Sequence, residues 1–319
     1  MIVFHDPSEV PHGFGPSIVV IGKFDGVHSG HRAVITRARV NAASSGARVV
    51  AVTFDRNPLS LLRPDLCPQA LVSLDQKVAL LADAGVDATL MLRFDEALAA
   101  LPPREFVEHV LVDALGVVRV LVGDDFRFGH GGAGTPALLA EMGAEYGFEV
   151  DVVGDVQGGS RRVSSSWIRE LLADGDVDGA ARLLGRPHGV QGEVVHGLKR
   201  GRELGFPTAN LSPDAEGFIP ADGVYAGWLI DHGPAVAPTS ATTRYPAAIS
   251  VGTNPTFGDV VVRQVEAYVL DEADLDLYAH RVKVDFVHRI RGMVAFEGID
   301  RLIARMATDV DEVRSVLRS

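Results

Sequence analysis

Ser17-Ile-Val-Val-Ile-Gly-Lys-Phe-Asp-Gly-Val-His-Ser-Gly-His31 is the stretch that decides the fold of the first half of this chain. Its apolar start predicts a buried strand, its glycines a turn, and the pattern after it a helix. The free N–H groups and the positive dipole end of such a helix attract an anion. His28 and His31, three residues apart, share one face of the first turn, where two imidazoles can donate to a phosphate. We therefore expect a phosphate site at this junction.

Apolar runs and helical patterns alternate through the rest of the first half. Continuous apolar strands are predicted at 17–21, 47–54, 88–92, 117–122 and 148–153. Helices that each stop at a glycine are predicted at 31–45, 74–84, 103–115 and 136–146. Such strands separated by helices predict a doubly wound, Rossmann-like parallel α/β sheet covered on both faces. Ligands on these sheets bind at the carboxyl ends of the strands, where the two histidines fall.

The pattern changes after a short helical pair at 166–173 and 177–184. Short strands without intervening helices are predicted at 189–196, 223–230, 247–251, 264–270 and 282–287. They favour an antiparallel barrel or sandwich, and an amphipathic helix is expected from about 298 to 317. We expect a mainly β domain, a small antiparallel barrel with a C-terminal helix, and a surface loop at 231–244. The domain boundary is expected near Gly185, which gives domains 1–185 and 186–319.

The composition of the 319 residues, 47% hydrophobic and 23% charged, is that of an ordinary globular protein long enough for two domains. The net charge of −12 argues against broad nucleic-acid binding, although backbone amides and a few arginines can hold a phosphate locally. The lone Cys67 has no catalytic surroundings and is interpreted as inert. The N-terminus is unlike a signal peptide and no apolar run could span a bilayer, so a cytoplasmic protein without membrane or nucleic-acid partners is expected.

Further polar segments follow the predicted strands of the first half. Residues 53–58 end the second strand, 123–129 end the fourth, and 162–169 enter a helix. In the last segment, three serines offer hydroxyl and N–H groups at a helix N-terminus and Arg169 lies one turn in, an arrangement suited to a triphosphate. On the residues alone, plain helix capping and a simple charged turn at 124–128 stay open. The common location at one sheet edge favours a site.

Read in order, these segments resemble the nucleotidyltransferase half of the bacterial bifunctional flavokinase and FAD synthetase family. The resemblance implies transfer of AMP from ATP to FMN, which gives FAD and pyrophosphate without a covalent enzyme intermediate. It implies that His28 and His31 are catalytic and bind the ATP phosphates, and that Asp125 and Phe128 lie on the flavin side. Asn57 stands where the family carries His, so it can hydrogen-bond a phosphate but carries no charge. The other implied ATP or phosphate contacts are Gly22, Phe24, Asn57, Ser164, Ser165, Ser166 and Arg169.

The second half contains Gly201-Arg-Glu-Leu-Gly-Phe-Pro-Thr-Ala-Asn210. Its glycines permit close backbone approach to a ligand, and Pro207 stiffens the exit. Thr208 and Asn210 bring oxygens of the hard type that Mg²⁺ accepts. On chemistry alone a structural turn stays open. With its neighbours the string resembles the riboflavin kinase module, which implies phosphorylation of riboflavin to FMN by ATP with Mg²⁺.

Segments 220–226, 250–257 and 265–270 match the same module in order. The resemblance makes Glu266 the general base that takes the proton of the ribityl 5′-hydroxyl as it attacks the γ-phosphate, whereas the residues alone leave an exposed strand glutamate open. It implies flavin contacts from Asn254 and Arg291. This chain departs from the family at Gly292-Met-Val-Ala295, where an acidic residue is missing. The implied ATP or phosphate contacts of the kinase are Gly197, Gly201, Gly205, Phe206, Pro207, Thr208, Asn210 and Tyr225.

The leading hypothesis is therefore one chain that performs two consecutive ATP- and Mg²⁺-dependent reactions, from riboflavin to FMN and from FMN to FAD. ADP and pyrophosphate are the other products, and the sequence leaves the oligomeric state open. A kinase with a decayed adenylyltransferase domain is favoured only by Asn57. A non-catalytic flavin-binding regulator would give Glu266, Thr208 and Asn210 no reason to coexist. A class I tRNA synthetase relative is disfavoured by the acidic charge and the kinase-like second half.

Overall fold

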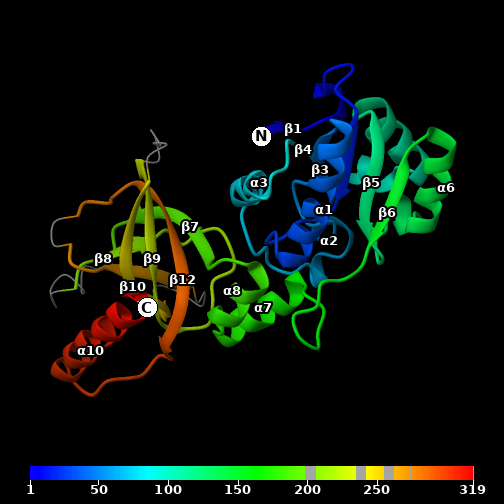
Figure 1. Cartoon of the computed structure of the whole chain (residues 1–319). Coiled ribbons are helices and arrows are strands. Elements are labelled where there is room, and N and C mark those ends of the chain that lie inside the picture. Colours follow the sequence, from blue (N-terminus) through cyan, green and yellow to red (C-terminus); the bar gives the residue numbers. More distant parts are fainter. Residues whose placement is uncertain (198–205, 235–241, 255–261, 273–274, 319) are drawn as a thin grey trace. The chain divides into compact units, whose positions relative to one another are not determined.

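The computed structural model describes residues 1–197, 206–234, 242–254, 262–272 and 275–318 (Figure 1). The chain forms two compact units. The first comprises Met1–Ala70 and Leu74–Ser164, and the second comprises Leu71–Ser73 and Ser165–Ser319.

A six-stranded parallel sheet forms the centre of the first unit, which confirms the predicted doubly wound α/β fold. The strand order is β1-β4-β3-β2-β5-β6. The sequence analysis missed β1, which is only three residues long. The strands are β1 (Ile2–Phe4), β2 (Ser17–Ile21), β3 (Arg48–Phe54), β4 (Ala88–Leu92), β5 (Val117–Gly123) and β6 (Glu149–Val153).

Helices cover both faces of this sheet (Figure 1). Ile18 and Val20 of β2 pack against one set of helices, and Val19 and Ile21 pack against the other, because successive strand side chains point to opposite faces. One set is α1 (Ser29–Ser45) and α3 (Leu74–Asp83), and the other includes α5 (Pro103–Phe106), the π-helical turn η3 (Val107–Ala114) and α6 (Pro136–Tyr146). Burial on both faces explains why the strand reads as a continuous apolar run.

Short helical segments connect these elements. The single helix predicted over 103–115 is instead α5 continued by a π-helix. Glycines end α1 and α6 as predicted, since Gly46 (φ +69°) and Gly147 (φ +82°) adopt the left-handed conformation. The remaining short segments of the unit are η1 (Pro7–Glu9), α2 (Leu59–Leu62), η2 (Pro64–Leu66), α4 (Glu96–Ala100) and η4 (His130–Gly132).

The strand order contains a switch point between β2 and β5. From β2 the chain runs outward through β3 and β4, whereas β5 lies on the other side of β2 and is followed by β6. Ligands bind outside the carboxyl ends of strands where the order reverses. The turns after β2 and β5 therefore lie where this fold binds ligands.

The second unit is built on a closed antiparallel barrel, which settles the choice between barrel and sandwich. Its strand order is β10-β11-β8-β7-β12-β9. The strands are β7 (His188–Val195), β8 (Thr208–Leu211), β9 (Gly223–Pro234), β10 (Thr243–Asn254), β11 (Val262–Val269) and β12 (His280–Arg291). The turn considered for residues 207–210 is wrong, because Thr208–Leu211 closes the barrel as β8 between β7 and β11. The loop predicted at 231–244 is also shorter, since 231–234 continue β9 and 243–244 begin β10; residues 235–241 lie outside the described residues.

Three helices lie beside the barrel strands in the described part of the second unit. α7 (Ser165–Asp174) and α8 (Val177–Leu184) pack with the barrel, where the Leu172 carbonyl accepts a hydrogen bond from the Ala221 N–H at 2.9 Å. The C-terminal helix α10 (Ile299–Arg318) lies on the outside of the barrel (Figure 1) and buries Val310 and Val313 against it. In the described part of the chain, none of the helices combines the length and apolar character needed to cross a bilayer.

Candidate active sites

The turn after β2 depends on small residues that make room for rings. A Cβ on Gly22 would lie 3.3 Å from the Phe24 ring, and one on Gly30 would lie 3.1 Å from the His28 ring. Phe24 and Val27 themselves adopt positive φ angles of 49° and 41°, which is unusual for side chains of this size. Backbone strain of this kind is often retained at functional sites, and here it sets the two histidines at the start of α1.

His28 and His31 form a stacked pair at the N-terminus of α1. Their ring centroids are 3.7 Å apart at an interplanar angle of 20°, and Phe24 packs edge-on against His31. Nδ1 of His28 accepts the backbone N–H of His31 at 3.4 Å, a long contact that places the ring proton of neutral His28 on Nε2. Nδ1 of His31 is buried and has no hydrogen-bond partner among the described residues. His31 thus has a ring nitrogen that no group of the described residues engages.

Cationic side chains surround His31. Burial holds the pKa of His31 well below its ordinary value. Repulsion from His28 when it is protonated, and from Arg162, Lys77 and Lys23, lowers it further. His31 is therefore neutral in the free protein, and a bound polyanion would oppose the effect of these cations. The arrangement favours a ligand with several negative charges.

Lys77 is buried, with 7% of its surface exposed. Its ammonium group donates to the Phe54 carbonyl at 3.0 Å, at the carboxyl end of β3. Burial lowers the pKa of Lys77, and the carboxylates of Asp25 and Asp55 oppose that shift. Asp55 also accepts the Phe94 N–H at 2.9 Å, which joins the ends of β3 and β4. Lys77 therefore fixes the turn after β3 next to the histidine pair.

Asn57, two residues beyond Asp55, uses its side chain locally. Its Oδ1 accepts the N–H of Leu59 at 3.1 Å, at the start of α2. The hydroxyl of the buried Thr53 donates to the Lys23 carbonyl at 3.2 Å and so ties β3 to the turn after β2.

The loop after β5 contains the two residues implied for the flavin. Asp125 is exposed and pairs with Arg162 at 2.9 Å, and Arg162 also pairs with Asp155 at 3.0 Å. Phe128 is only 7% exposed and packs against Phe126. Its ring is a core side chain that shapes the loop, whereas Asp125 is accessible.

The serine segment crosses the boundary between the compact units. Ser164 is the last residue of the first unit, and Ser165, Ser166 and Arg169 belong to the first turns of α7 in the second. The structure thus brings His28 and His31 together, while the serine segment is divided between two units.

In the barrel unit, strand pairing brings together the kinase residues. β11 pairs with β8 in a register that places Glu266 opposite Asn210 and Tyr268 opposite Thr208. The Thr208 hydroxyl hydrogen-bonds the Glu266 carboxylate. Burial raises the pKa of Glu266, and this hydrogen bond partly offsets the shift. A half-buried carboxylate with a raised pKa is a competent proton acceptor near neutral pH.

Asn210 is held beside Thr208. Its Nδ2 donates to the Thr208 carbonyl at 3.1 Å and to the Thr208 hydroxyl at 3.3 Å. A Cβ on Gly197 would lie 2.5 Å from the Asn210 amide, so only glycine fits there. The described residues contain no cluster of three or more His, Cys, Asp or Glu that could hold a metal ion. The hydroxyl and amide oxygens of Thr208 and Asn210 do fit Mg²⁺, which takes few protein ligands beside phosphate and water.

Of the other residues implied as kinase contacts, Phe206 and Tyr225 make contacts within the barrel unit itself. Phe206 packs edge-on against Tyr268 at 5.3 Å, and the half-buried Pro207 leads into β8. Tyr225 is fully buried and donates its hydroxyl to the Ala221 carbonyl, so it holds the loop before β9. Asn254 ends β10. Gly201 and Gly205 lie outside the described residues.

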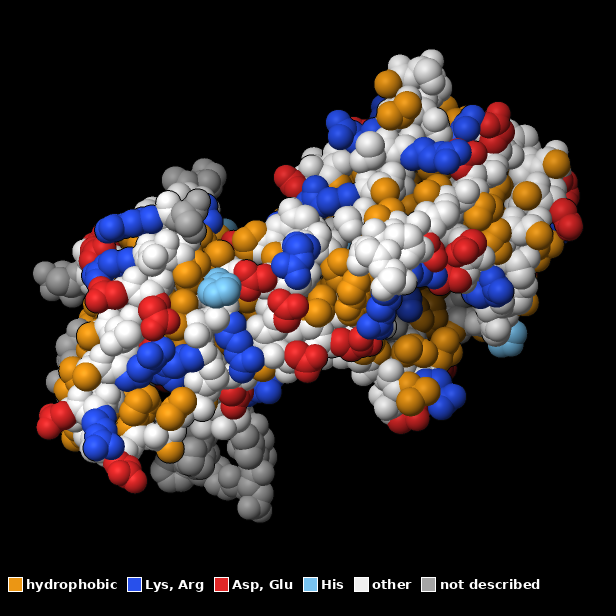
Figure 2. Space-filling model, turned by 60° about the horizontal axis from the view of Figure 1, so that its bottom comes forward, with side chains coloured by type: hydrophobic (Ala, Val, Ile, Leu, Met, Phe, Trp, Pro, Cys, Tyr) orange, Lys and Arg blue, Asp and Glu red, His pale blue; other side chains and the backbone are white. Residues whose placement is uncertain are grey.

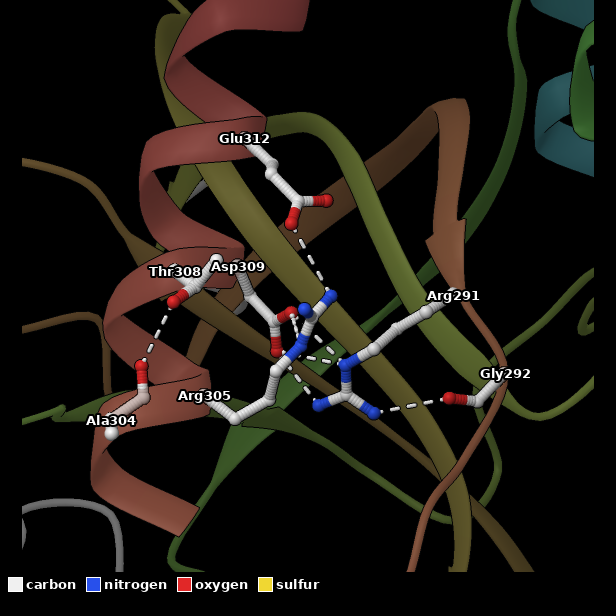
Figure 3. A network of polar contacts seen from close by, with 7 residues as sticks. All are labelled: Arg291, Gly292, Ala304, Arg305, Thr308, Asp309 and Glu312. Carbon is white, nitrogen blue, oxygen red and sulfur yellow. Dashed lines mark hydrogen bonds and ion pairs between the residues drawn. The ribbon is translucent and has the colours of Figure 1, made fainter. Parts of the chain in front are cut away.

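Arg291, implied as a flavin contact, is occupied by a buried carboxylate (Figure 3). Its Nε donates to both oxygens of Asp309 at 3.0 Å, and its Nη2 donates to Oδ2 at 2.7 Å. Its Nη1 donates to the Gly292 carbonyl at 3.0 Å. Arg291 thus connects β12, α10 and the following loop.

Sequence reasoning missed Lys77, Arg162 and Asp309. A signal existed for Lys77, because it lies one turn before the buried Leu81 in α3, on a helix face where a lysine is out of place unless it has a partner. Arg162 begins the polar segment 162–169, but the sequence analysis assigned it no function. Asp309 gave no signal, since an acidic residue in an amphipathic helix is normally exposed. On the face that Figure 2 draws, acidic and basic side chains are intermixed, so the sites depend on local groups.

Models of two protein families match the chain in order. The FAD synthetase model matches residues 12–167, and the riboflavin kinase model matches residues 184–317. The bifunctional riboflavin kinase/FMN adenylyltransferase of Escherichia coli (strain K12) is 37% identical over 305 residues, which cover 96% of this chain and 93% of the relative. The protein of the same name from Pseudomonas fluorescens is 36% identical over 299 residues, with 94% and 92% covered.

A solved structure has the same fold. The crystal structure of a macrolide-efflux protein from Streptococcus pneumoniae matches with a TM-score of 0.84 and 31% identity over 98% of both chains. Its name describes efflux, whereas both family models and the curated relatives describe flavin chemistry.

Proposed function

Because the chain belongs to the family of bifunctional riboflavin kinases/FMN adenylyltransferases, we propose which of its residues carry out each of the two reactions. The chain phosphorylates riboflavin to FMN with ATP. It also transfers the adenylyl group of a second ATP to FMN, which yields FAD and pyrophosphate.

We assign adenylyl transfer to His28 and His31. The observation that carries this assignment is the stacked ring pair at the switch point of the sheet, with cations around it. An FMN phosphate oxygen attacks the α-phosphorus of ATP, and the bond to the leaving pyrophosphate breaks. Imidazole N–H groups stabilise the negative charge that develops on the phosphates, and Lys77 and Arg162 add positive charge nearby.

We propose four further groups of contacts for this site. Gly22 and Phe24 shape the turn that orients His31, and Asn57 holds the start of α2. Asp125 is the accessible candidate on the flavin side, and Phe128 supports its loop. The assignment of the triphosphate to Ser164, Ser165, Ser166 and Arg169 rests on the family pattern.

We assign the kinase reaction to Glu266 as general base. The observation that carries this assignment is the β8–β11 register, which joins Glu266 with Thr208 and Asn210. The carboxylate takes the proton of the ribityl 5′-hydroxyl as its oxygen bonds to the γ-phosphorus of ATP. The bond between the γ-phosphorus and the β–γ bridging oxygen breaks, and ADP leaves.

Thr208 and Asn210 are proposed to hold Mg²⁺, together with phosphate oxygens of the substrate. When bound, the ion neutralises charge on the transferred phosphoryl group. The contacts of Asn210 with Thr208, and the absence of a side chain at Gly197, orient both oxygen donors in advance.

We propose functional domains 1–185 and 186–319. The riboflavin kinase match begins at residue 184, and α7 and α8 join it to the FAD synthetase match that ends at 167. We also propose that the protein works in the cytoplasm, in keeping with its single, free cysteine.

The histidine assignment is tested by the double change His28→Ala, His31→Ala. We expect FAD formation from FMN to fall at least about a hundredfold, the usual cost of losing a transition-state donor, while FMN formation from riboflavin stays within about twofold. Chromatography that separates riboflavin, FMN and FAD measures both. His109→Ala, at an exposed histidine of the same unit, is the control. Unchanged FAD synthesis in the folded double variant would show that the assignment is wrong.

A further inference from the structure

The C-terminal helix is fixed to the barrel by a buried ion cluster (Figure 3). Asp309 of α10 is 3% exposed and accepts three hydrogen bonds from Arg291. Its Oδ1 also pairs with Nε of Arg305 at 2.8 Å, and Arg305 pairs in turn with Glu312 at 3.3 Å. Removing a carboxylate from such a cluster leaves buried positive charge uncompensated, so Asp309 holds Arg291 in a single orientation.

Arg291 transmits this orientation to the loop 292–298. Its Nη1 donates to the Gly292 carbonyl, and its guanidinium lies 5.7 Å from the centre of the Phe296 ring. Within the loop, Met293 reaches back to β10, since a Cβ on Gly252 would lie 2.9 Å from its terminal methyl group. The loop is thus held at its first residue, at Phe296 and at Met293.

α10 and this loop cover the barrel face that carries Glu266. On β11 the buried Val265, Ala267 and Val269 alternate with half-buried residues, so Glu266 and Tyr268 point outward. Val310 and Val313 of α10 pack in one apolar cluster with Tyr268 and its β10 neighbour Ala248. Ser250, two residues after Ala248 on β10, pairs with Glu266. Gly252, a further two residues along, is the residue that Met293 contacts.

The loop presents an apolar surface beside this face. Met293 and Val294 are 53% and 58% exposed, a large fraction for apolar side chains. Such side chains suit the flat aromatic ring of a flavin and are unsuited to the phosphates of ATP. The two substrates of the kinase reaction can therefore be distinguished at this loop.

We propose that Asp309 is a positioning residue for riboflavin: it holds Arg291, and through it the loop 292–298 as an apolar wall of the riboflavin site. The proposal rests on the kinase role assigned to Glu266. Arg291 then acts through the loop rather than as a hydrogen-bond donor to the flavin, because its Nε and Nη2 already donate to Asp309 and its Nη1 donates to the Gly292 carbonyl.

Asp309→Asn tests the proposal, because it keeps the shape of the side chain and removes its charge. We expect the KM for riboflavin to rise about tenfold, with the KM for ATP and kcat within about twofold. Riboflavin fluorescence titration should show the same loss of affinity, and FAD synthesis from FMN should not change. The matched control is Asp311→Asn in the same helix, where the side chain is 77% exposed and pairs with Arg314 at 3.0 Å; it should behave as wild type.

A merely structural role predicts a different result, namely a lower active fraction that reduces kcat and leaves both KM values unchanged. That pattern, or a wild-type KM for riboflavin in folded Asp309→Asn, would overturn the proposal.

If Asp309→Asn does not fold, Arg291→Lys is the second test. A lysine loses the two-pronged contact with Asp309 but keeps the positive charge, and we expect a smaller rise in the KM for riboflavin. A wild-type value there would also overturn it. Full kinase activity of a Glu266→Gln variant would instead refute the proposed general base, and that failure is separate from a failure of the Asp309 proposal.

Discussion

At the scale of single residues, Glu266 combines burial with a hydrogen-bonded neighbour. Burial disfavours the carboxylate and raises its pKa, while the Thr208 hydroxyl stabilises the charged form. The net effect is a raised pKa, so the Glu266 carboxylate accepts a proton more readily than an exposed glutamate does. Burial acts on His31 in the opposite sense, because there the charged form is the protonated one.

Glu266→Gln keeps size and hydrogen-bonding capacity but removes the proton acceptor. We expect riboflavin phosphorylation to fall by about a hundredfold to ten-thousandfold, with little change in riboflavin binding. FAD synthesis from supplied FMN should persist, because that reaction is assigned to the part of the chain that matches the FAD synthetase model. Steady-state kinetics of both half-reactions measure this. Glu193→Gln on the exposed side of β7 is the control, and full kinase activity of Glu266→Gln would leave Thr208 and Asn210 with a positioning role only.

At the scale of elements, the turn after β3 is held by hydrogen bonds to two different helices. The side chain of Asn57 holds the start of α2, and a buried lysine from α3 supports the end of β3. The conformation of the turn thus depends on α2 and α3, two helices that are separate in the sequence.

Asn57→His should be tolerated without loss of FAD synthesis. An imidazole Nδ1 can accept the Leu59 N–H as the amide oxygen does, and Nε2 then carries a proton that can reach a phosphate. The KM for ATP in the adenylyl half-reaction should stay equal or fall. Asn57→Ala serves as the comparison and should destabilise the start of α2, at a cost of about 1 kcal/mol. A large loss of adenylyl transfer in folded Asn57→His would show that the loop has been rebuilt around asparagine.

At the scale of the whole molecule, His188 couples the stability of the barrel unit to pH. The side chain is buried in β7, and its Nε2 donates to the Phe218 carbonyl at 2.7 Å. Burial lowers its pKa to about 4 from the ordinary 6.5, and the hydrogen bond to Phe218 opposes the shift. The imidazole is therefore neutral in the folded barrel and protonates first in the unfolded chain.

Because the folded pKa is depressed, the contribution of His188 is complete above pH 6.5 and is lost as pH falls toward 4. Between pH 7 and 4.5, the free energy of unfolding of wild type should fall by about 2 kcal/mol more than that of His188→Gln, which keeps a donor for Phe218. Urea unfolding followed by tryptophan fluorescence reports this unit, since Trp167 and Trp228 both lie in it. Parallel pH curves for the two proteins would contradict the prediction.

The sequence by itself determined the parallel sheet, most of its strand bounds and the position of the histidine pair. Strands buried on both faces must be continuously apolar, and glycines must end the helices, so local composition carries the information. The family motifs likewise pointed to Glu266, Thr208 and Asn210 before their arrangement was known.

Only the tertiary structure decided which distant side chains meet. β8 is too short and polar to be read as a strand, yet barrel closure pairs it with β11 and sets Glu266 opposite Asn210. The burial of Lys77 and the pairing of Arg291 with Asp309 depend equally on contacts between separate elements. Periodicity records which face of an element is apolar, but it contains no register between elements, and register decides which charges become neighbours.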